Sequence, residues 1–169
     1  EATSCVTFQE YDFGYALGSA AGKWIAEKLG GEAKYAILNQ PTLPQVIDRE
    51  NGIKAGIEEY APNAELAATA AANLTDTGMR ATETILQANP DIQVVLGVND
   101  SGALGAYEAV MASGLDVTNF FVGGCDGATE ALTKIKDGTI YRASAGLELP
   151  NEDIGRLCMD YAVKAVNGE

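Results

Sequence analysis

Apolar and polar residues alternate along this chain with two different periods. Short, largely apolar runs predict buried strands at residues 4–8, 33–39, 65–72, 93–98, 120–125 and 141–147. Each run is followed by a stretch whose apolar residues recur three and four positions apart, which predicts helices at 13–29, 44–60, 76–89, 101–114, 127–137 and 151–167. Turn residues such as Asn89-Pro90 and Asp137-Gly138 separate these segments.

The repeated strand-helix order predicts an α/β fold. Strands that alternate with helices form a parallel sheet, and strands that are apolar throughout require helices on both faces of it. We therefore expect a doubly wound sheet in a three-layer αβα arrangement. A chain of 169 residues is long enough to bury a core as one domain.

Polar residues stand where several of the predicted strands end. The segment VVLGVNDSGALGAYEAV passes from an apolar strand into a helix at Asn99 and Asp100, and Asn73, Asp126 and Glu148 hold similar positions. In an open α/β sheet, ligands bind beyond the carboxyl ends of the strands. However, Asn and Asp are also preferred helix N-caps, so capping and ligand binding are both open at each position.

Charge and motif content exclude several classes of function. With 24 acidic and 11 basic residues, the net charge of −13 argues against direct binding to nucleic acid. Cys5, Cys125 and Cys158 are widely spaced without a CxxC pair, which indicates neither a disulfide set nor a zinc site. The chain lacks a dinucleotide or P-loop motif and an apolar run that could span a bilayer. We expect no cofactor and no metal.

One segment has the spacing of a nucleophile elbow. Gly123-Gly124-Cys125-Asp126-Gly127 places a cysteine between a strand and a helix, as such an elbow requires. A cysteine nucleophile needs a base, normally histidine, and the chain contains no histidine. We therefore expect that the protein is not an enzyme and that Cys125 is buried and unreactive.

The remaining polar groups offer both donors and acceptors: Arg49, Asn99, Asp100, Asp126 and Glu148. Such a mixture suits a polyhydroxylated neutral ligand, because each hydroxyl needs a donor and an acceptor. An alternative exists for Arg49, which could pair with Asp48 or Glu50 on a helix surface.

Four segments together resemble a known family. The stretches IDRENGIKAGIEEY, TETILQANPDIQVVLGVNDSGALGAYEAV, FFVGGCDGATEALTKIKDG and ELPNEDIG are similar, in collinear order, to the C-terminal lobe of type I periplasmic solute-binding proteins, the ribose- and galactose-binding group. The resemblance implies a two-lobed protein that closes on a sugar and delivers it to an ABC transporter without covalent chemistry.

The resemblance also implies a set of ligand-binding residues. The sugar-binding arginine, asparagine and aspartate of the family fall on Arg49, Asn99 and Asp126, and its hinge glutamine falls on Glu148. An aromatic residue that often stacks on the sugar falls near Asn73, where this sequence departs from the pattern. A sugar, a polyol or a more cationic solute is compatible with these changes.

Further expectations concern partners and context. The resemblance implies an N-terminal lobe that is missing here, with segments 1–10 and 149–169 bordering or belonging to it. It implies a transporter permease as partner and a periplasmic or extracellular location, either free or lipid-anchored. The alternative function is the effector-sensing domain of a lactose-repressor-like regulator. The helix at 151–168 carries an apolar stripe that predicts self-association of the lobe: Ile154, Leu157, Cys158, Tyr161, Ala162 and Ala165.

Overall fold

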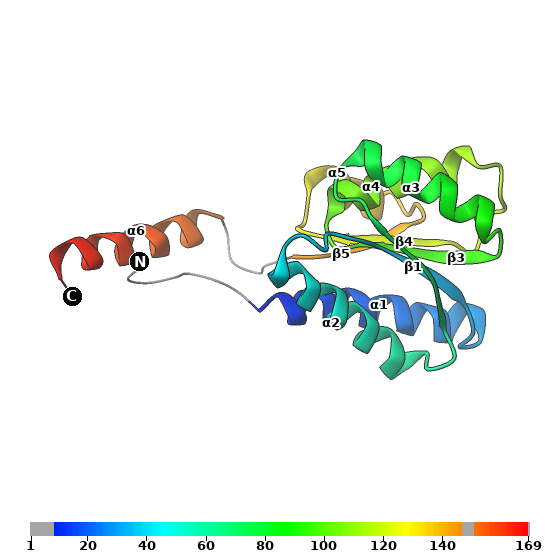
Figure 1. Ribbon diagram of the computed structural model, residues 1–169, viewed down its shortest axis with the longest axis horizontal. Helices are drawn as coiled ribbons and strands as arrows, with labels where there is room; N and C mark the ends of the chain where they lie inside the picture. The colour runs from blue at the N-terminus through cyan, green and yellow to red at the C-terminus, as the bar shows by residue number, and fades with distance from the viewer. Residues whose placement is uncertain (1–8, 147–150, 169) are drawn as a thin grey trace. The chain divides into compact units, whose positions relative to one another are not determined.

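The computed structural model describes residues 9–146 and 151–168 (Figure 1). The chain divides into two units, of which one comprises Glu10–Gly146 and the other contains the last helix. The predicted strand at 4–8 and the candidate site residue Glu148 lie outside the described residues.

Helices and strands alternate along the described chain. The helices are α1 (Glu10–Leu29), α2 (Pro44–Tyr60), α3 (Thr75–Ala88), α4 (Asp100–Ala112), α5 (Thr129–Lys136) and α6 (Asn151–Asn167). The strands are β1 (Lys34–Asn39), β2 (Glu65–Ala71), β3 (Ile92–Gly97), β4 (Phe121–Cys125) and β5 (Tyr141–Ala145). The first helix begins at Glu10 rather than at residue 13, and α5 is shorter than predicted.

The five strands form one parallel sheet in the order β2-β1-β3-β4-β5. Helices α1 and α2 cover one face, and α3, α4 and α5 cover the other (Figure 1). The predicted three-layer, doubly wound α/β fold is therefore confirmed.

Alternate strand residues fill two cores, one on each side of the sheet. In β1, Tyr35 and Ile37 pack toward α1 and α2, whereas Ala36 and Leu38 pack toward the other helical layer. This alternation is the period of two that a strand imposes on its side chains. Burying each large side chain stabilises the fold by about 1.5–3 kcal/mol, so both faces contribute to stability.

Helices α1 and α2 pack with their backbones in near contact. A Cβ atom on Gly14 would lie 1.8 Å from the carbonyl oxygen of Arg49, and one on Gly18 would lie 2.1 Å from that of Ile53. No residue with a side chain fits at such a distance, so the two glycines set the spacing of the helices. They thereby also set the position of Arg49 over the edge of the sheet.

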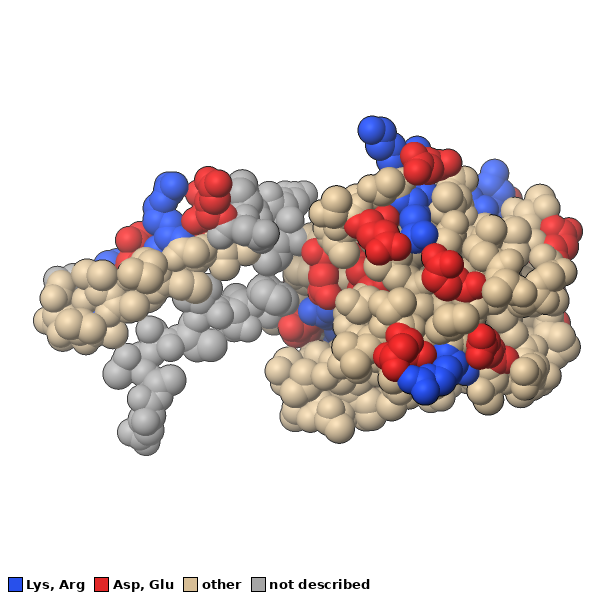
Figure 2. Space-filling model, turned by 90° about the horizontal axis from the view of Figure 1, so that it is seen from above, with Lys and Arg blue, Asp and Glu red and all other residues tan. Residues whose placement is uncertain are grey.

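Charged side chains are spread over the face shown in Figure 2, where acidic groups stand beside basic ones and no broad basic area is visible. The surface also carries ion pairs, for example Lys34 with Asp91 at 2.7 Å. No helix within the described ranges is long and apolar enough to cross a membrane.

Candidate ligand-binding site

The candidate site lies at the carboxyl edge of the sheet, where the strand order reverses. From β1 the chain passes through α2 outward to β2, and α3 then carries it back across to β3. The carboxyl ends of β1 and β3 are therefore neighbours whose following helices leave on opposite faces. Such a switch point is where open α/β sheets bind ligands.

Arg49, in the second turn of α2, reaches over this edge. Its Nη1 atom donates to the carbonyl oxygen of Val98 at 2.6 Å and to Oδ1 of Asp126 at 2.9 Å. Its side chain is only 8% exposed. The alternative that Arg49 merely pairs with Asp48 or Glu50 on a helix surface is wrong, because the guanidinium is buried and bound to groups far away in sequence.

Glu10, the first residue of α1, is the second acidic partner of Arg49. Its Oε2 atom accepts from Nε at 2.6 Å and lies 2.5 Å from Nη2. The Glu10 side chain is 16% exposed. Since Glu10 and Asp126 flank one guanidinium, this cluster carries one more negative than positive charge. Glu10 follows a predicted strand, as the candidate residues do, but it was not among the site residues predicted from the sequence.

Asp126 is the most accessible member of the cluster, with a side chain that is 52% exposed. Its backbone adopts a positive φ of 106°, which is uncommon for a residue other than glycine. Burial raises the pKa of the Asp126 carboxyl, while Arg49 beside it acts in the opposite direction. Asp126 thus offers solvent a carboxylate that is held in place by a buried cation.

Asn99 serves as the N-cap of α4, as the capping interpretation predicted. Its Oδ1 atom accepts from the backbone N–H of Gly102 at 2.9 Å, and its Nδ2 donates to the carbonyl oxygen of Asn73 at 2.9 Å. One N–H and one lone pair of the amide remain outside these bonds. Capping therefore leaves Asn99 able to offer one donor and one acceptor at the same edge.

Known proteins share this architecture. The sequence profile described as "Periplasmic binding protein domain" matches residues 1–169. The chain is 34% identical over 154 residues to the ribose import binding protein RbsB of Bacillus subtilis, which covers 90% of this chain and 48% of that protein. This chain belongs to the periplasmic binding protein family.

Other members of the family extend the comparison. The D-apiose import binding protein of Actinobacillus succinogenes is 35% identical over 128 residues, covering 75% of this chain and 40% of that protein. A solute-binding protein of an ABC transporter from the same organism, solved with D-allose, has a TM-score of 0.81 and 28% identity and covers 97% of this chain and 55% of its own. The myo-inositol binding protein of Caulobacter has a TM-score of 0.67 and 29% identity, with 83% and 48% coverage. The chain spans about half the length of the curated relatives it matches.

Asn73, where the resemblance implies an aromatic residue, is half-buried between β2 and α3. Leu74 next to it is 56% exposed, so an aliphatic side chain stands beside this position. An aromatic ring is present near Arg49 instead, because the guanidinium carbon lies 5.3 Å from the centre of the Phe13 ring.

Asp100 differs from the other candidates because its carboxylate is turned inward. The residue is 1% exposed, and its two oxygens accept hydrogen bonds from Tyr141, Ser144 and the backbone N–H of Ala128. The structure thus brings Arg49, Asn99 and Asp126 to one edge with polar atoms still available, whereas Asp100 is engaged within the fold.

Cys125 is fully buried at the end of β4. Burial raises the pKa of its thiol to about 12. A thiol of this kind is not deprotonated near neutral pH and cannot act as a nucleophile. Cys125 in the elbow-like turn is therefore a buried thiol that stays protonated near neutral pH.

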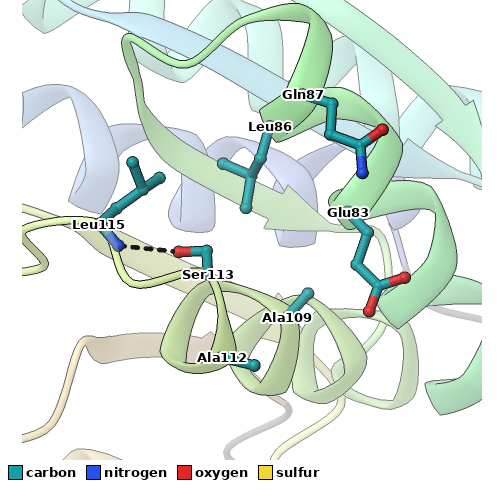
Figure 3. Close-up of a pocket in the computed structure, with 7 residues that line it drawn as sticks. All are labelled: Glu83, Leu86, Gln87, Ala109, Ala112, Ser113 and Leu115. Carbon is teal, nitrogen blue, oxygen red and sulfur yellow. Dashed lines mark hydrogen bonds between the residues drawn. The ribbon is translucent and has the colours of Figure 1, made fainter.

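A separate pocket of about 240 Å³ lies between α3 and the end of α4, away from this edge (Figure 3). Leu86, Ala109 and Leu115 provide its apolar lining, and Glu83 and Gln87 stand at its rim. The Ser113 hydroxyl in it already donates to Val110 and accepts from Leu115. Its polar groups do not converge on a common point, so it is not the candidate site.

Proposed function

We propose that this chain is the ligand-binding lobe of a solute-binding protein that delivers a sugar or polyol to an ABC transporter. The observation that carries the proposal is the buried Arg49, which the fold holds against a half-exposed Asp126 at the switch point of the sheet. The family and the ligands of its relatives, ribose, apiose, allose and myo-inositol, support it.

The hydrogen-bonding capacity of the edge favours hydroxyl groups. Three of the five N–H donors of Arg49 donate to Glu10, Val98 and Asp126, and the other two belong to Nη2, which is ion-paired with Glu10. Asp126 adds acceptors, and Asn99 adds one donor and one acceptor. A vicinal diol can donate to the carboxylate while it accepts from the amide and the guanidinium. We assign Arg49, Asn99 and Asp126 to direct contact, with Asn73 beside them and Glu148 at the hinge.

We propose that the other half of the ligand contacts come from a second, N-terminal lobe, which segments 1–10 and 149–169 border. The coverage of about half of each relative supports this arrangement. The permease of an ABC transporter is then the partner of the closed protein, in the periplasm or outside the cell, free or lipid-anchored. If one lobe keeps half of a micromolar binding free energy of about 8 kcal/mol, it binds with a dissociation constant near millimolar.

Helix α6 carries the apolar stripe that this second lobe would cover. Leu157 and Tyr161 lie one turn apart on it, and Ile154 and Cys158 continue the same face. We propose that in the 169-residue chain this stripe pairs with a second copy. Light scattering over a concentration series tests this step, because a strictly monomeric mass at high concentration would contradict it.

The transport function is favoured over a repressor. The relatives named above are import or solute-binding proteins, whereas a lactose-repressor-like regulator shares only the sensing fold. We further propose that the protein has no enzymatic activity, and the buried thiol of Cys125 supports this.

A thermal-shift comparison of three proteins tests the proposal. The wild-type chain, Asp126→Asn and Asp91→Asn are each melted with and without D-ribose, D-apiose, D-allose or myo-inositol. Asn tolerates the positive φ of residue 126, so the first variant removes the charge and keeps the backbone. Asp91 is also ion-paired but stands just before β3, at the opposite edge, and is the matched control.

We expect one of these compounds, at about 50 times its dissociation constant, to stabilise the wild-type chain and the Asp91 variant by about 2 kcal/mol. The Asp126 variant should lose most of that stabilisation, because a charged hydrogen bond contributes about 1.5–3 kcal/mol. Concentrated sugar also stabilises proteins without binding to a site. This effect is the same for all three proteins and cancels when their shifts are compared. Equal stabilisation of the three proteins by every compound would refute the assignment.

A further inference from the structure

Asp100 is a buried carboxylate whose hydrogen bonds come from neutral donors. Its Oδ1 atom accepts from the Tyr141 hydroxyl at 2.7 Å, and its Oδ2 accepts from the Ala128 backbone N–H at 2.7 Å. The Ser144 hydroxyl lies 2.9 and 2.8 Å from the two oxygens. Burying a carboxylate costs free energy, and packing alone does not require a carboxylate at this position.

An ionised carboxylate only accepts hydrogen bonds, so every partner of Asp100 has to donate. The Ser144 hydroxyl proton is therefore directed at Asp100, and a lone pair of its oxygen is left for another donor. The backbone N–H of Gly127 donates to this Ser144 oxygen, at a nitrogen–oxygen distance of 3.0 Å. Asp100 thus fixes the direction of a hydrogen-bond chain that ends on the turn after β4.

Three consecutive amides of that turn have acceptors within the fold. Ala128 N–H is bound by Asp100 directly, Gly127 N–H is bound through Ser144, and Asp126 N–H donates to the Ala145 carbonyl at 2.7 Å. The turn includes the positive φ of 106° at Asp126, a conformation that persists only where its surroundings hold it.

Glycine in β4 makes room for this arrangement. A Cβ atom on Gly124 would lie 2.5 Å from Oδ1 of Asp100 and 2.5 Å from the Tyr141 hydroxyl oxygen. The carboxylate and the tyrosine therefore meet directly above the strand that leads into the turn.

We propose that Asp100 is a positioning residue of the binding site: its buried carboxylate fixes the turn after β4 so that Asp126 presents its own carboxylate to Arg49 and to the ligand. Asp100 itself does not touch the ligand. This role rests on the proposed function only as far as the ligand is concerned, because the turn and the contact between Asp126 and Arg49 are features of the fold.

The test compares Asp100→Asn with Tyr141→Phe. The asparagine has nearly the same shape, but its amide nitrogen cannot accept from Ala128 or Ser144. The phenylalanine removes one hydrogen-bond donor to Asp100 and leaves the bonds to the turn in place. It is the control for the general effect of losing a buried hydrogen bond at Asp100. Amide hydrogen exchange by NMR is measured at Gly127 and Ala128, with the Val122 amide of β4 as the internal reference.

We expect Asp100→Asn to accelerate exchange at Gly127 and Ala128 at least tenfold relative to Val122, and Tyr141→Phe to change it less than twofold. Equal acceleration in the two variants, or none in either, would overturn the proposal. If Asp100→Asn does not fold, Ser144→Ala decides the matter. It should accelerate exchange at Gly127 and leave Ala128 unchanged, and an unchanged Gly127 would be the contrary result.

A second measurement extends the test to binding. Titration with D-ribose or D-allose should give a dissociation constant at least tenfold higher for Asp100→Asn than for wild type, and within twofold of wild type for Tyr141→Phe. A wild-type affinity that both variants keep would overturn the positioning role. If the wild-type chain binds neither these two sugars nor D-apiose or myo-inositol, the proposed function fails, and the exchange rates still decide whether Asp100 holds the turn.

Discussion

Replacing Gly14 with alanine should damage the fold more than any other single methyl group added to α1. The new Cβ atom would stand 1.8 Å from the carbonyl oxygen of Arg49, whereas ordinary contact begins at 3.4 Å. Backbone atoms of α2 cannot rotate away as a side chain would. The helices therefore have to separate by roughly 1.5 Å at this point, which lies under the binding site.

The expected loss of stability follows from two opposing effects. Overpacking of this kind costs about 1–3 kcal/mol and occasionally more, and separated helices also lose dispersion contacts around Leu17 and Ile53. In the opposite direction, alanine has a higher helix propensity than glycine, which stabilises the helix by about 1 kcal/mol. We expect Gly14→Ala to lower the free energy of unfolding by about 2 kcal/mol, a large share of the total for a domain of this size.

Urea unfolding followed by circular dichroism and tryptophan fluorescence measures this change. Trp24 is the single tryptophan, and it packs against Phe121 of β4 with ring centres 5.5 Å apart, so its emission reports how α1 sits on the sheet. A loss of about 2 kcal/mol corresponds to a midpoint lowered by roughly 1 M.

Gly22→Ala is the matched control, because its new Cβ atom would lie 3.1 Å from its nearest neighbours and needs only a small adjustment. We expect its stability to stay within about 1 kcal/mol of wild type. A Gly14→Ala variant as stable as the wild-type chain, or more stable than Gly22→Ala, would show that the two helices can separate at little cost.

Three further predictions concern the site. Cys125 should resist thiol reagents in the native protein at pH 8, because burial raises its pKa to about 12, and peptide mapping that finds it rapidly labelled would contradict this. The pKa of the Asp126 carboxyl is raised in the folded protein, so its protonated form stabilises the fold at pH values below the unfolded pKa. This stabilisation is lost as the pH rises through the folded pKa. Carbon-detected NMR should find that pKa above 3.8 and higher still in Arg49→Met, while a lower value in the variant would count against the contact. Glu10→Gln should lower stability by about 1.5–3 kcal/mol in urea unfolding, because it weakens a buried ion pair, whereas Asp76→Asn at an exposed pair should have no measurable effect.

The layer arrangement could be predicted from the sequence because buried parallel strands are apolar throughout. Runs such as residues 93–98 differ in length and periodicity from the helical stretches beside them. The start of α1 was placed too late, since Glu10, Tyr11 and Asp12 show no apolar period. The acidic residues in its first turn were nevertheless a signal, because negative charge stabilises a helix N-terminus.

Part of the site was predictable for the same reason. Residues at the carboxyl ends of parallel strands share one edge, which brought Asn99 and Asp126 together in the prediction. Glu10 also follows a predicted strand but was not assigned to the site, because its contact with Arg49, 39 residues away in sequence, forms only when α1 and α2 pack together.

Asp100 shows where a sequence pattern stops being informative. It stands beside Asn99 at the same strand end, and both residue types cap helices and bind ligands. Only the fold separates them, because Tyr141 and Ser144 of β5 reach Asp100 from 41 and 44 residues away and enclose its carboxylate. Their contribution depends on the pairing of β4 with β5, which no local pattern contains.

Nitrogen-15 NMR titration of the 169-residue chain with D-ribose, D-allose and myo-inositol, up to about 50 mM, shows directly whether the edge that holds Arg49 and Asp126 binds a ligand. We predict saturable shifts of the backbone signals of Asn99, Asp126 and Gly127 and of the Arg49 Nε–H, with a dissociation constant near millimolar for at least one compound. The signals of Lys34 and Asp91 at the opposite edge should stay unchanged. The proposed site is wrong if no compound shifts the signals of the Arg49 and Asp126 edge, or if saturable shifts gather around Lys34 and Asp91 instead.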